Sequence, residues 1–60
     1  MSAVYNPEAD TMAAIERLER EARDMRRRLE WANNDEDRRV VTKQLTEIES
    51  DITRLQAQLP

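Results

Sequence analysis

Apolar residues recur at alternating steps of three and four along two stretches of this chain. This spacing is the heptad pattern of a helix that packs one apolar stripe against another helix. It predicts two helices, over about residues 7–32 and 36–59. We call the apolar residues of the two stripes the seam. Its members are Ile15, Leu18, Ala22, Met25, Leu29 and Ala32 in the first stretch, and Val41, Leu45, Ile48, Ile52, Leu55 and Leu59 in the second.

Local signals mark where each helix begins and where the chain turns. Asn6 followed by Pro7 is typical of a helix start, with asparagine as the N-cap and proline in the first turn. This leaves residues 1–6 as a short N-terminal arm before a hairpin of residues 7–60. The polar run of residues 33–37 interrupts the seam, and we expect a turn over about residues 33–36. Asn34 or Asp35 can cap the second helix, and an asparagine can end the first in a left-handed conformation.

The pairing of the two stripes favours a hairpin over one continuous helix. When the chain folds about Asp35, Ala22 comes level with Ile48 and Met25 with Leu45, and the same relation holds for the other seam residues in consecutive layers. A continuous helix would carry the polar Asn34 and Arg38 in the seam. We therefore expect an all-α fold, an antiparallel two-helix hairpin of the coiled-coil type.

A hairpin of this size has little core of its own. Chains this short bury barely enough apolar surface to offset the entropy of ordering, and the sequence holds no cysteine for a disulfide. Each seam side chain also stays open on the side away from the opposite helix. We expect association to supply the missing stability, most simply as a homodimer that forms a four-helix bundle.

Composition argues against several classes of function. The chain has no histidine, no cysteine and no glycine, and its net charge is −3. Without a histidine base, a thiol or a glycine-rich phosphate loop, we expect no enzyme, no cofactor and no metal site. The acidic balance disfavours a general polyanion binder. The sequence also lacks a signal pattern or a membrane-length apolar run, so we expect a location in the cytoplasm or within a phage or other protein assembly.

Two groups of charges remain open to a functional interpretation. A basic cluster gathers at the turn end, where its members could contact phosphates or an acidic partner: Arg26, Arg27, Arg28, Arg38 and Arg39. Acidic neighbours make this a mixed patch, and compensation of the helix dipole is the simpler explanation. In the middle of the hairpin Glu19 should lie near Glu49. Such carboxylates could bind a cation, or they could splay apart towards nearby arginines.

Trp31 is the residue that is hardest to explain structurally. It falls at heptad position c, away from the seam, and Val40 occupies the equivalent position on the second helix at nearly the same level. An outward tryptophan beside a valine and arginines has the composition of an interface anchor. Alternatively, Trp31 folds over the turn and covers Ala32. Val4 and Tyr5 form a second apolar pair that could bind a partner or the open end of the hairpin.

The layout resembles the ROP-type plasmid RNA-binding hairpins, which dimerise into a four-helix bundle. Heptads alone carry this resemblance. It implies a nucleic-acid-binding regulatory dimer that would use the arginine cluster. The residues themselves favour a non-enzymatic protein that binds itself or another protein. We expect a homo-oligomer or a component of a larger assembly, and the preference for arginine over lysine is typical of a GC-rich bacterium or its phage.

Overall fold

Helix α1 begins at the predicted asparagine cap. In the computed structural model, which describes residues 6–60, α1 spans Pro7–Glu30. The side-chain oxygen of Asn6 accepts hydrogen bonds from the backbone N–H groups of Glu8 and Ala9, at 3.1 and 3.2 Å. These are donors that have no partner inside the helix, so the cap stabilises the first turn. The predicted helix start is confirmed.

The end of α1 differs in detail from the sequence prediction. The helix stops at Glu30, before the expected end near residue 32, and Trp31 is its C-cap. The N–H groups of Trp31 and Ala32 donate to the carbonyls of Arg28 and Leu29, at 3.1 and 3.3 Å. These tight bonds, typical of a 3₁₀ turn, satisfy the last carbonyls of the helix. No residue among 6–60 has a positive φ, so the left-handed asparagine considered above is not used.

Helix α2 spans Asp35–Gln56 and starts at the second predicted cap. The side-chain oxygen of Asn34 accepts a hydrogen bond from the N–H of Asp37 at 2.8 Å. The cap is therefore Asn34 and not Asp35. The helix ends before the expected residue 59, because the N–H groups of Gln58 and Leu59 bond to carbonyls only three residues back, in successive tight turns.

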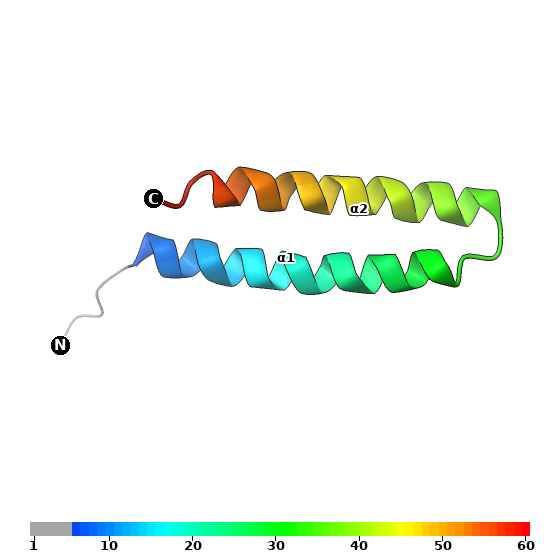
Figure 1. Cartoon of the computed structure of the whole chain (residues 1–60), viewed down its shortest axis with the longest axis horizontal. Coiled ribbons are helices and arrows are strands. Elements are labelled where there is room, and N and C mark those ends of the chain that lie inside the picture. The colour runs from blue at the N-terminus through cyan, green and yellow to red at the C-terminus, as the bar shows by residue number, and fades with distance from the viewer. Residues whose placement is uncertain (1–5) are drawn as a thin grey trace.

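The two helices lie side by side and run in opposite directions (Figure 1). Every seam residue is buried or half-buried, which confirms the hairpin and rules out a continuous helix. Among residues 6–60, only Ile15 and Ala22 are buried, with exposed fractions of 7% and 1%. Helix α2 buries no residue completely. The hairpin thus covers its apolar stripe from one direction only, as expected for a single layer of two helices.

Within the described residues, neither helix is long and apolar enough to cross a membrane.

Candidate interaction surface

The hairpin has two broad faces, which the heptad positions distinguish. In α1, Ile15 and Ala22 occupy position a; in α2, Leu45 and Ile52 do. At 100° per residue, positions c and g lie on one face of the hairpin and positions b and e on the other. Seam residues at d border the first face, and those at a border the second. We name the first the Trp31 face and the second the Glu49 face.

The hollows on the surface agree with this division. A hollow on the Trp31 face is lined by the d residues Ala32 and Val41, together with the outward residues Arg28, Trp31, Asp37 and Val40. A groove on the Glu49 face is lined by the a residues Ala22 and Ile52, together with Glu19, Arg23, Arg26, Glu49 and Thr53. Each face therefore presents a different half of the seam to its surroundings.

Trp31 and Val40 come together on the Trp31 face, next to the turn. Trp31 is 77% exposed and Val40 is 52% exposed, and both line the same hollow. An exposure this large is incompatible with a tryptophan folded down over the turn to shield Ala32. Both side chains are large, apolar and open to solvent, which is the chemical character of an anchor for a partner.

The basic residues near the turn do not share one face. Arg27 and Arg28 line a hollow with Trp31, and Asp24 also lines it. Arg26 belongs to the opposite face, because it precedes Arg28 by two residues and the side-chain direction rotates by about 200° over two residues of a helix. Arg38 and Arg39 are exposed at the beginning of α2. The structure thus distributes the five arginines around the turn end and mixes them with carboxylates.

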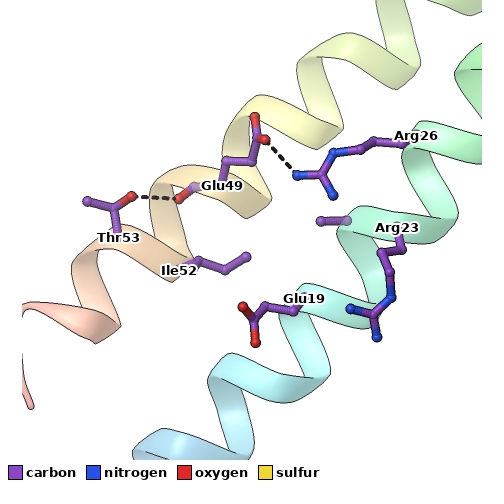
Figure 2. Close-up of a pocket in the computed structure, with 7 residues that line it drawn as sticks. Glu19, Arg23, Arg26, Glu49, Ile52 and Thr53 are labelled. Carbon is purple, nitrogen blue, oxygen red and sulfur yellow. Dashed lines mark hydrogen bonds and ion pairs between the residues drawn. The ribbon is translucent and has the colours of Figure 1, made fainter.

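On the Glu49 face, an arginine bridges the two helices. Arg26 extends from α1 across to α2, where its guanidinium nitrogen lies 3.0 Å from a carboxylate oxygen of Glu49 (Figure 2). The hydroxyl of Thr53 donates to the main-chain oxygen of Glu49 at 3.1 Å, and Glu19 lines the same groove. Glu19 and Glu49 are thus neighbours, as expected. The sequence did not single out Arg26 as this partner; it occupies the same flanking position e as Glu19, one heptad nearer the turn.

The Trp31 face carries one ion pair and further carboxylates without one. Asp51 is half-buried and pairs with Arg54 of the next turn at 3.1 Å. Glu21 and Glu47 make no ion pair with any residue of the described part of the chain. This face therefore offers exposed apolar residues at one end and unpaired acids in the middle.

The remaining candidates carry little chemistry. Among residues 6–60, no group of three or more acidic side chains is arranged to hold a metal ion. Val4 and Tyr5, the other predicted partner-binding residues, lie outside the described residues.

Comparisons with protein-family models, with curated proteins and with solved structures give no match for this chain. Inference about its function therefore depends on its own surface.

Proposed function

We propose that this chain is a non-enzymatic protein–protein interaction module. It acts as a homo-oligomer or as a small subunit of a larger bacterial or phage assembly, in the cytoplasm or within that assembly. The observation that carries the proposal is the exposure of Trp31, 77%, beside the half-exposed Val40 on one face. Tryptophan is enriched among residues that dominate binding energy at interfaces.

The thin core supports the same proposal. Fully burying a leucine or isoleucine is worth about 1.5–3 kcal/mol relative to leaving it exposed. Most large seam residues are only half-buried, so a substantial part of that free energy is not realised within one hairpin. A partner that covers either face would realise it. Association therefore stabilises the fold and at the same time buries the surface that the hairpin leaves open.

No specific observation favours the alternative, a nucleic-acid-binding dimer. The arginines near the turn lie on different faces, and Arg26 already pairs with Glu49. Nucleic-acid binding would require affinity for RNA or duplex DNA that falls steeply as salt rises. A titration across salt concentrations tests it directly.

The proposal is tested by sedimentation over a range of protein concentrations, with Trp31→Ala compared with Met12→Ala. Met12 is also exposed and apolar, at 52%, but it lines a hollow on the Glu49 face. We expect dimers or larger species whose melting temperature rises with concentration. Trp31→Ala should raise the dissociation constant by about 30-fold, since truncating an anchor commonly costs ~2 kcal/mol, and Met12→Ala should change it much less.

A monomer at every concentration that also captures no protein partner through Trp31 would contradict the proposal. Strong salt-dependent binding of nucleic acid by the same sample would favour the alternative.

A further inference from the structure

We infer that the occupant of the Trp31 face is a second copy of this chain, stacked face to face with its turn at the opposite end. This inference rests on the proposed function and specifies its partner and geometry. The two-fold axis would run across the hairpin near the level of Glu19 and Asp51, so that the two copies overlap along α1 and along α2 from about residue 42 onward. Helix α1 would then lie over α1 of the second copy, and α2 over α2.

The distribution of burial selects the Trp31 face. Ile15 and Ala22, the two buried residues among 6–60, are both a residues and border the Glu49 face, where the other four a residues of the seam are half-buried. Every d residue stays half-buried, and these residues border the Trp31 face: Leu18, Met25, Ala32, Val41, Ile48 and Leu55. On the Glu49 face, by contrast, the Arg26–Glu49 pair already spans the helices. More apolar surface therefore remains exposed on the Trp31 face than on the Glu49 face.

Charge disfavours the arrangement with both turns at the same end. Stacked that way, α1 of one copy would lie over α2 of the other at equal levels. Glu21 would then face Asp51, Asp24 would face Glu47, and Arg17 would face Arg54, each twice by symmetry. Like charges held opposite each other are destabilising, and here they would repeat along the interface.

The opposite orientation turns this pattern into attraction along α1. Level by level, Asp10 of one copy meets Arg28 of the other, and Arg17 meets Glu21, again twice by symmetry. Glu21, which makes no ion pair within the described hairpin, thereby gains a partner. All of these residues occupy c or g and so lie on the Trp31 face.

The polar residues of α2 are also complementary between the two copies in this orientation. Glu47, also without an ion pair in the described hairpin, comes within one residue of the level of Arg54 of the second copy, and Gln44 comes level with Gln58. Of these α2 residues, only Asp51 lies opposite the same residue of the second copy, near the two-fold axis. Its charge is offset there by Arg54 of the same chain, 3.1 Å away.

The ends of the hairpin also match. The open end carries a hollow lined by Pro7, Thr11, Leu59 and Pro60, among others. In this dimer Trp31, at the turn end of one copy, comes level with Pro7 at the open end of the other. The exposed anchor of each copy would thus lie over a hollow of its partner that is partly apolar and is also lined by Glu8 and Gln58.

A charge exchange tests the orientation. Arg28→Glu and Asp10→Arg should each weaken dimerisation about tenfold, and the chain that carries both changes should return to within about threefold of the parent. The two positions are about 27 Å apart along one helix, so the recovery has to arise between chains. Arg20→Glu, an exposed change of equal charge at position f, serves as the control and should shift the dissociation constant less than twofold.

Disulfide trapping tests the axis independently, since the chain has no cysteine of its own. Asp51→Cys alone should give an interchain disulfide under mild oxidation. An equal mixture of Gln44→Cys and Gln58→Cys chains should give the mixed dimer. Thr46→Cys lies at position b, on the Glu49 face, and should remain a thiol.

The outcomes separate this inference from the proposed function. Dimers that show neither the charge recovery nor the Asp51→Cys disulfide overturn the orientation and leave the interaction module standing. A disulfide in a mixture of Glu21→Cys and Asp51→Cys chains, without the Asp51→Cys homodimer, overturns the orientation in favour of the arrangement with both turns at the same end. A monomer at all concentrations overturns the second copy as the occupant, whether or not Trp31 binds another protein.

Discussion

Truncation of Ile15 is the most direct test of where the hairpin keeps its core. Ile15 is the largest of the buried side chains, with 7% of its surface exposed. Ile15→Ala removes side-chain carbons from a site that is already closed within one hairpin. Met12→Ala is a matched control, because it removes the same number of heavy atoms one turn away on the same helix. Met12 is 52% exposed.

The expected cost follows from this difference in burial. Each buried methylene is worth about 0.8 kcal/mol, and truncation in a closed core adds a cavity term, so isoleucine-to-alanine changes cost about 2–5 kcal/mol. Because Ile15 borders the surface of a thin layer that can relax, we expect the lower half of that range, about 2–3 kcal/mol. Met12→Ala should cost less than about 1 kcal/mol, because roughly half of its transfer free energy is never realised.

Thermal unfolding followed by far-UV circular dichroism measures both changes at one protein concentration. For a domain of this size 1 kcal/mol corresponds to about 4–8 °C, so Ile15→Ala should lower the melting temperature by about 10–20 °C. Met12→Ala should lower it by a few degrees. Equal losses in the two variants would refute the reasoning, because they would show that burial within one hairpin does not govern its stability.

Three further outcomes are expected. Cysteines introduced together at Ala22 and Ile48 should form a disulfide within one chain, seen as a monomer on a non-reducing gel; exclusively interchain products would contradict the hairpin. Asn34→Ala should cost about 1 kcal/mol in denaturant unfolding, since the cap of α2 is lost, and no loss would show that water replaces it. A double-mutant cycle of Arg26→Ala and Glu49→Ala should give a coupling of only about 0.2–1 kcal/mol that disappears at high salt, because the two side chains are 55% and 50% exposed. A larger, salt-independent coupling would contradict the description of Arg26 and Glu49 as a solvent-exposed ion pair.

The helix starts and the seam could be derived from the sequence, because their causes are local. The Asn6 and Asn34 caps depend on hydrogen bonds to residues two or three positions ahead. The hairpin follows from a heptad pattern that lapses at a polar run and resumes in register. Even the approach of Val40 to Trp31 follows, since both occupy the same heptad position at nearly equal distance from the turn.

Other features depended on how the two helices settle against each other. The heptad pattern predicted that α1 continues to about residue 32, yet 3₁₀ bonds end it at Glu30, because the short connection has to reverse direction there. It did not assign Arg26 to Glu49, since a long side chain can reach several levels of the facing helix and only packing selects one. The sequence also did not determine which residues of the seam become buried. The heptad pattern does not distinguish positions a and d by burial, and only the packing of the two helices closes the surface over Ile15 and Ala22 while leaving every d residue and the other a residues of the seam half-buried.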